Sequence, residues 1–212
     1  MAIIKSGASS DQLTVDPASK AGRVTLYDSA GRELSYQLKQ TFMASGSFTP
    51  AATPTDLVTI YGSATKTVRI VSLKLTTTNT AAGSQEYFII KRSAANTGGT
   101  FVAGTAVPLD SDNVAATATA GHYTANPSGL GAAVGTIATF RVASPVAKPA
   151  TFAGIVQDAG YDFLAISQAG KGSFMDQAVT LRGTAQGLVV NFNGAALVAG
   201  QTHAYTLLWM EE

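Results

Sequence analysis

Two histidines and one acidic pair are the side chains that could support catalysis. His122 and His203 lie in different regions, and no G-x-S-x-G stretch supplies the serine on a sharp turn that a Ser–His–Asp site needs. We therefore expect both histidines to be surface or interface residues. Asp158 and Asp162 could form the carboxylate pair of a glycoside hydrolase, but no surrounding pattern supports that reading. The sequence predicts a protein that is not an enzyme.

The stretch LDSDNVA holds three oxygen ligands close together, Asp110, Asp112 and Asn113. A calcium-binding EF-hand loop would need a glycine after the third ligand and a glutamate at its twelfth position, and neither is present. We interpret the stretch as a short acidic turn, with a weak calcium site as the alternative.

Two glycine-rich stretches depart from the patterns of nucleotide-binding loops. GLGAAVG, residues 129–135, has the wrong final spacing for a dinucleotide fingerprint and no acidic residue on a following strand. AGKGS lacks the upstream glycine that a phosphate-binding loop requires. We therefore predict no cofactor.

Composition narrows the class of protein. The 212 residues are 46% hydrophobic, which is enough for one sizeable domain, or a domain with an extension. Charged residues make up only 13%, against about 25% in typical soluble domains. A weakly charged surface of small polar residues suits a chain that packs against copies of itself, so we expect an oligomer.

Charge and cysteine content exclude several classes of partner. The net charge is +1 with scattered basic residues, which argues against a nucleic-acid partner. The absence of cysteine excludes disulfides, thiol catalysis and cysteine-ligated zinc. The N-terminal MAIIKSGASSD has too short an apolar run for a secretory signal, and no stretch approaches the length of a membrane span. We expect synthesis in a cytoplasm and no membrane partner.

Alternating apolar residues with frequent glycine and proline predict an all-β chain. The clearest strand is TVRIVSLKLTTT, residues 67–78, and DLVTIYG before it is the expected partner strand. The apolar phase slips by one at Ile70 and Val71, which predicts either a β-bulge or a strand buried on both faces at that point.

The last third predicts two more strands, QGLVVNF and HAYTLLWMEE, with the strong turn signal Asn193-Gly194 after the first. Tyr205, Leu207 and Trp209 share one face of the final strand, where we expect them in the core or in a subunit interface. We predict a jelly-roll-like β-sandwich over residues 57–212, a linker over residues 46–56 and an extended N-terminal arm over residues 1–45.

Exposed aromatic side chains can stack on sugar rings. The candidates for such a platform are Tyr61, Tyr87, Tyr123, Tyr161 and Trp209, of which Trp209 is better suited to the core or an interface.

Two stretches carry a family resemblance. VDPASKAGRVTLYDSAGREL, residues 15–34, resembles the N-terminal segments of structural proteins of tailed bacteriophages. GLVVNFNGAALVAGQTHAYTLLWMEE, residues 187–212, resembles the closing hairpin of β-sandwich phage virion proteins. The resemblance implies a capsid decoration (cement) protein, forming homotrimers and binding the major capsid protein or another virion protein. The alternative is a tail, fibre or baseplate module that binds a host-surface glycan or protein.

The resemblance also implies a role for the N-terminal arm, which would lie on the capsid shell of the virion. Its apolar residues alternate without an evident local core, so we expect them to add a strand to a neighbour's open sheet edge. The residues expected to make this contact are Leu13, Val15, Val24, Leu26 and Tyr27.

Overall fold

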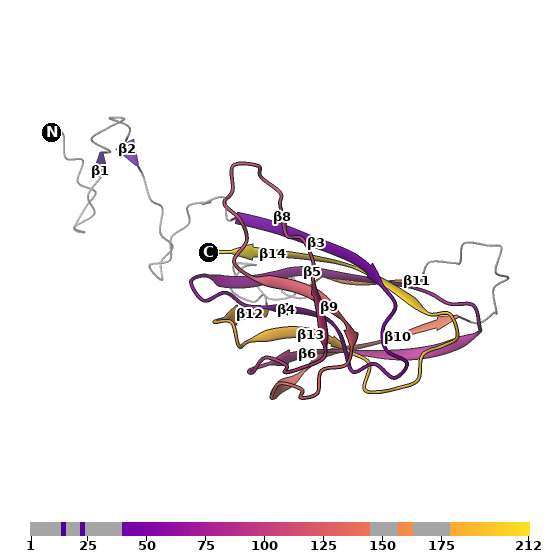
Figure 1. Ribbon diagram of the computed structural model, residues 1–212. Coiled ribbons are helices and arrows are strands. Elements are labelled where there is room, and N and C mark those ends of the chain that lie inside the picture. Colours follow the sequence, from indigo (N-terminus) through magenta and orange to yellow (C-terminus); the bar gives the residue numbers. More distant parts are fainter. Residues whose placement is uncertain (1–13, 16–21, 24–39, 145–156, 163–178) are drawn as a thin grey trace, which may run out of the picture. The chain divides into compact units, whose positions relative to one another are not determined.

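The fold is described from a computed structural model, which describes residues 14–15, 22–23, 40–144, 157–162 and 179–212 (Figure 1). The chain divides into two compact units, Met1–Lys39 and Gln40–Glu212. All regular elements in these described ranges are strands. Within the same ranges no helix is long and apolar enough to cross a lipid bilayer.

The first unit contains a two-stranded antiparallel sheet. In it β1 (Thr14–Val15) pairs with β2 (Gly22–Arg23), and Val15 lies opposite Gly22. Val15 therefore has a strand partner within the same unit. The other residues expected to bind a partner through the arm lie outside the described residues: Leu13, Val24, Leu26 and Tyr27.

The second unit is a sandwich of two antiparallel sheets, which lie above one another in Figure 1. Sheet I has the strand order β10-β6-β13-β4-β9-β7. Its strands are β4 (Asp56–Tyr61), β6 (Gly83–Arg92), β7 (Thr100–Ala103), β9 (Thr119–Ala125), β10 (Ala133–Ser144) and β13 (Gly187–Asn191). The prediction of an all-β sandwich is confirmed, whereas the jelly-roll connectivity and the extended arm stay predictions.

Sheet II has the order β11-β5-β14-β3-β8, and β12 also pairs with β5. Its strands are β3 (Gln40–Phe48), β5 (Thr67–Thr78), β8 (Val107–Pro108), β11 (Gln157–Asp162), β12 (Val179–Arg182) and β14 (Thr202–Glu211). The strands β11 and β12 lie along the same edge of β5, because they pair with different halves of it.

The C-terminal strand β14 is central in sheet II, between β3 and β5. Its inward side chains Tyr205, Leu207 and Trp209 are all buried, and Trp209 is fully enclosed. The Trp209 ring stacks on Phe42 of β3 with ring centroids 5.9 Å apart. These three residues of β14 therefore lie in the core of a single subunit.

A β-bulge explains the slipped apolar phase of β5. Leu208 of β14 pairs with Ser72, and the next residue, Trp209, pairs with Ile70, so Val71 has no partner on β14. The extra residue lets both Ile70 and Leu73 face the core despite their odd spacing. Of the two alternatives that the sequence left open, the structure has the bulge.

Two expected strand pairings are wrong. The strands β4 and β5 lie in different sheets, and so do β13 and β14, so neither pair forms a hairpin. The turn at Asn193-Gly194 does form, with positive φ angles of 57° and 70°. It begins the connection from β13 in sheet I to β14 in sheet II. The Phe192 amide donates to the Thr55 carbonyl at 2.7 Å and the Gly194 amide to the Pro54 carbonyl at 2.9 Å, which ties the turn to the segment before β4.

The sandwich begins at Gln40 and not at residue 57. The strand β3 pairs with β14 along its whole length, from Gln40 opposite Glu211 to Phe48 opposite His203. The predicted arm and linker therefore contain residues 40–48, which belong to the sandwich. The boundary between the two units therefore falls after Lys39.

Candidate functional site

Both histidines lie in the core, on facing sheets. His122 belongs to β9 and His203 to β14, and both are buried. The ring of Phe48 stacks on both imidazoles, with centroid separations of 4.3 Å to His122 and 5.7 Å to His203. The expectation that they are surface or interface residues is therefore wrong, because aromatic packing between the sheets encloses them.

The hydrogen bonds of His203 are structural. Its Nε2 lies 3.1 Å from the Tyr87 hydroxyl, to which Gln201 Nε2 also donates at 2.9 Å. Burial lowers the pKa of His203 to about 4, and burial also lowers the pKa of His122. Both imidazoles are therefore neutral at pH 7. Among the described residues no carboxylate or serine hydroxyl bonds to either ring, so the pair packs the core.

The acidic stretch forms a turn. The Asp112 amide donates to Asp110 Oδ1 at 3.0 Å, and the Asn113 amide donates to the Asp110 carbonyl at 3.1 Å. One Asp110 carboxylate oxygen is thus used to close the turn, as an aspartate does in many tight turns. Within the described ranges no group of three histidine, aspartate or glutamate side chains is placed to hold a metal ion.

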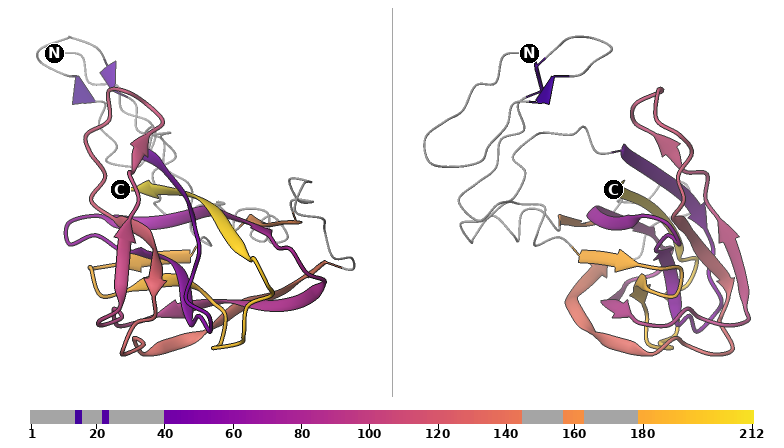
Figure 2. Two further views of the ribbon diagram at one scale, coloured as in Figure 1. Left: turned by 45° about the vertical axis from the view of Figure 1, so that its right-hand side comes forward. Right: turned by 90° about the vertical axis from the view of Figure 1, so that its left-hand side faces the viewer.

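Residues 104–118, which we call the β7–β9 connection, form the most distinctive surface of the sandwich. The connection leaves β7 in sheet I, pairs through β8 with β3 in sheet II, and returns to β9 in sheet I. Figure 2 shows it rising past the sandwich as a long loop. It therefore joins the two sheets along one side of the sandwich.

The connection is anchored near its middle and at its end. The Leu109 amide donates to the Thr41 carbonyl at 2.9 Å. The amides of Thr117 and Ala118 donate to Glu211 Oε1 at 3.0 and 2.9 Å, and Trp209 Nε1 donates to the same oxygen at 3.1 Å. Burial by itself would raise the pKa of Glu211, but these hydrogen bonds outweigh it and hold the pKa below its ordinary value. The buried carboxylate therefore fixes the return of the connection.

Between and beside these anchors the connection exposes apolar side chains. Val107 is 54% exposed, Leu109 is 56% exposed and Val114 is 61% exposed. Single exposed apolar residues are common, but three on one anchored loop indicate a contact surface.

This part of the chain has no basic side chain, and its two acidic side chains both lie on the connection. Between Arg92 and Arg141 the only charged side chains in the sequence are Asp110 and Asp112. An edge that avoids association usually displays lysine or other charges. The long interval without lysine or arginine is the signal in the sequence that points to this surface.

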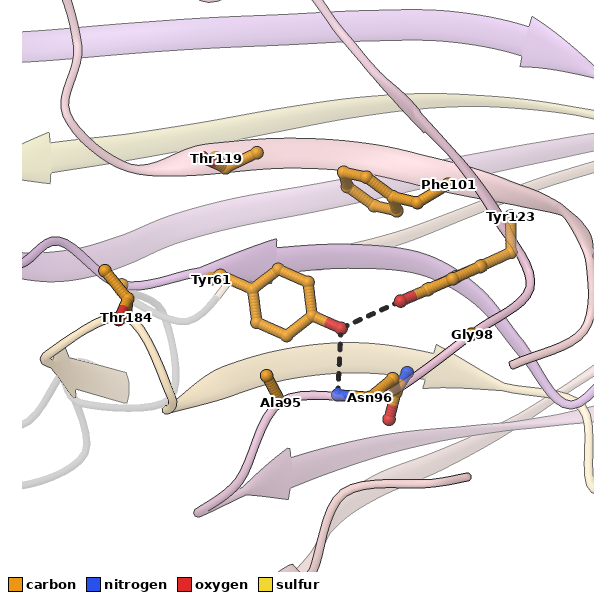
Figure 3. Close-up of a pocket in the computed structure, with 9 residues that line it drawn as sticks. Tyr61, Ala95, Asn96, Gly98, Phe101, Thr119, Tyr123 and Thr184 are labelled. Carbon is orange, nitrogen blue, oxygen red and sulfur yellow. Dashed lines mark hydrogen bonds between the residues drawn. The ribbon is translucent and has the colours of Figure 1, made fainter. Parts of the chain in front are cut away.

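The aromatic candidates divide between the core and a pocket. Tyr87 and Trp209 are buried in the core. Tyr61 and Tyr123 line a pocket of about 360 Å³ on sheet I together with Phe101, a residue that the sequence did not single out (Figure 3). The side chain of Tyr161 lies outside the described residues.

Comparison with protein-family models, with curated proteins and with solved structures found no match. The class of protein is therefore set by its fold and surfaces alone: a β-sandwich with an anchored apolar loop at one edge and an aromatic pocket on sheet I.

Proposed function

We propose that this chain is a non-enzymatic structural subunit of a larger assembly, acting as a capsid decoration protein of a tailed phage. The single observation that carries the proposal is the exposure of Val107, Leu109 and Val114 on an anchored connection that has no basic side chain. A partner that covers these side chains removes apolar surface from water, which stabilises the complex by roughly 1 kcal/mol for each half-exposed side chain.

Anchoring makes the connection suitable for assembly. The Leu109–Thr41 backbone hydrogen bond and the bonds of Glu211 hold the connection near its middle and at its end, so binding orders little additional chain. A surface that is ordered before contact loses less conformational entropy on association. The apolar side chains would therefore meet a partner in a defined arrangement.

The phage setting rests on the resemblance of residues 15–34 and 187–212 to virion proteins. In this proposal the first unit contacts the major capsid protein or another virion protein, and the sandwich contacts sister subunits to form a homotrimer. A subunit that binds only the assembled shell stabilises it by mass action. The proposed location is the virion.

The oligomer is tested by measuring the mass of the full chain in solution by light scattering after size-exclusion chromatography. The chain has a mass of 21.7 kDa, so a trimer has three times that mass. The double variant Leu109→Ser, Val114→Ser is expected to dissociate it. Val134→Ser is the matched control, because Val134 is 63% exposed on β10 at the opposite edge of sheet I. A monomeric parent, or dissociation by the control alone, contradicts the role of the connection.

The role of the first unit is tested by deleting residues 1–39 and measuring cosedimentation with heads assembled from the major capsid protein of the same phage. The cut is placed there because β3 begins at Gln40 and contributes Phe42 to the core. The folded truncation is expected to lose binding. Retained binding would place the capsid contact on the sandwich instead.

The tail, fibre or baseplate module that binds a host surface is the second candidate. The aromatic pocket on sheet I is the observation that favours it.

A further inference from the structure

The pocket on sheet I is built on two aromatic rings that lie over glycines. Tyr61 ends β4 and lies opposite Gly187 of β13, where a Cβ would come within 3.1 Å of the Tyr61 ring. Phe101 of β7 lies over Gly121 of β9, where a Cβ would come within 2.6 Å of Phe101 Cζ. The two glycines therefore give the rings room to lie against the sheet, which fixes their positions.

Tyr123 completes the aromatic set. Its ring centroid lies 5.1 Å from that of Phe101, and Phe101 lies 6.0 Å from Tyr61 in an edge-on arrangement. The hydroxyls of Tyr61 and Tyr123 are 2.9 Å apart, as Figure 3 shows. The three rings therefore form one connected wall.

A buried ionic network holds the loop that faces this wall. The backbone N–H of Asn96 donates to the Tyr61 hydroxyl at 3.3 Å, and the side-chain Nδ2 of Asn96 donates to Asp56 Oδ2 at 2.7 Å. Asp56 also binds Arg92 through two hydrogen bonds of 2.8 Å, and both of these side chains are buried. Because this network is formed by the protein alone, the pocket is shaped before any ligand arrives.

The pocket offers hydroxyl groups and no ionic side chain. The two phenols carry two O–H hydrogens, and the contact between them uses one, so the second hydrogen can serve a ligand. Burial raises the pKa of Tyr61, so its phenol stays protonated at neutral pH. Thr119 and Thr184 add hydroxyls at the exposed rim. The charges of Asp56 and Arg92 compensate each other.

We propose that the Tyr61–Phe101–Tyr123 pocket binds a neutral saccharide unit. A sugar ring presents C–H faces that stack on aromatic rings and hydroxyls that bond to phenols and threonines. An ionic ligand would find no opposite charge in the lining. The volume of about 360 Å³ is at the small end of ligand pockets, which fits one or two sugar residues. This binding does not depend on the assembly role proposed above.

The test is saturation-transfer NMR on the full chain with glucose, galactose, mannose, N-acetylglucosamine and N-acetylgalactosamine as separate probes. Ring C–H protons of at least one sugar are expected to receive saturation. Thr184→Arg, which places a long side chain at the rim, is expected to abolish the signal. Ala185→Arg is the matched control, because its neighbouring exposed position does not line the pocket.

A second variant removes one of the two phenol hydroxyls. Tyr123→Phe keeps the ring and removes one hydrogen-bonding group, so it is expected to weaken binding by about 2- to 10-fold. Choline and sialic acid serve as charged probes. The proposal is overturned if no neutral sugar binds, if only a charged probe binds, or if Thr184→Arg behaves like Ala185→Arg. None of these results alters the mass measured in the assembly test.

Discussion

Acid is expected to destabilise the sandwich through His203. Burial lowers the pKa of His203 from 6.5 to about 4 in the folded chain, whereas the unfolded chain keeps the ordinary value. Above pH 6.5 both states are neutral and the full stability is present. As the pH falls below 6.5 the unfolded state binds a proton that the folded state does not, so the free energy of unfolding decreases until about pH 4.

The magnitude follows from the two pKa values. At about 1.36 kcal/mol for each pKa unit, the full effect is about 3 kcal/mol. Between pH 7.5 and pH 5 about 2 kcal/mol of it should be lost. His122 adds a loss of the same sign, because burial lowers its pKa as well. The groups that face His203 are Tyr87, Gln201 and the rings of Phe48 and Phe192, none of which titrates in this range.

The assay is urea unfolding at pH 7.5 and pH 5, followed by the fluorescence of Trp209, the single tryptophan of the chain. His203→Phe keeps an aromatic ring and removes the proton site, so its free energy of unfolding should depend less on pH than that of the parent. His122→Phe is the matched control, and its free energy of unfolding should keep the pH dependence that His203 contributes. An unchanged pH dependence in His203→Phe would refute this reasoning, whatever the stability of that variant at pH 7.5.

Three further outcomes are expected. Arg92→Met leaves the buried Asp56 carboxylate without its counter-ion, so the free energy of unfolding should fall by about 3–5 kcal/mol in urea titration, and a loss under about 1 kcal/mol would contradict a structural role for the pair. Glu211→Gln replaces one carboxylate oxygen by an NH2 group, which cannot accept the hydrogen bonds of the backbone amides. The free energy of unfolding should fall by about 1–3 kcal/mol and the tryptophan emission should shift; unchanged emission would argue against this anchor. Gly121→Ala places a Cβ too close to the Val102 carbonyl oxygen and 2.6 Å from Phe101 Cζ, so it displaces β7 together with the Phe101 ring; the free energy of unfolding should fall by about 1–3 kcal/mol and sugar binding should weaken, whereas retained binding would show that the ring position is not needed.

The fold class and several local features could be predicted from the sequence. A side-chain period of two is a local property, so it indicated strands without knowledge of their partners. For the same reason the phase slip at Ile70 and Val71 indicated either a bulge or a strand buried on both faces, and the structure has the bulge. The alternation of Tyr205, Leu207 and Trp209 likewise indicated a buried face, which lies in the core.

The pairing of strands could not be predicted from the same pattern. Neighbours in the chain, such as β4 and β5, lie in opposite sheets. In contrast, β3 and β14 are the first and last strands of the second unit in the sequence, and they pair side by side in sheet II. Alternation tells which side chains face inward, but not which of the two inner faces they join. The Asn193-Gly194 turn shows this limit, since its backbone geometry was predictable and the sheet that it leads to was not.

The aromatic pocket was decided by tertiary structure. Tyr61, Phe101 and Tyr123 come from three strands, and the two glycines that make room for the rings lie on neighbouring strands. The sequence by itself determined that the chain forms short strands with one buried face each, because that depends on residues two apart. Which faces meet, which histidines are enclosed and which rings share a wall depend on register between distant strands, and only the packed sandwich sets that register.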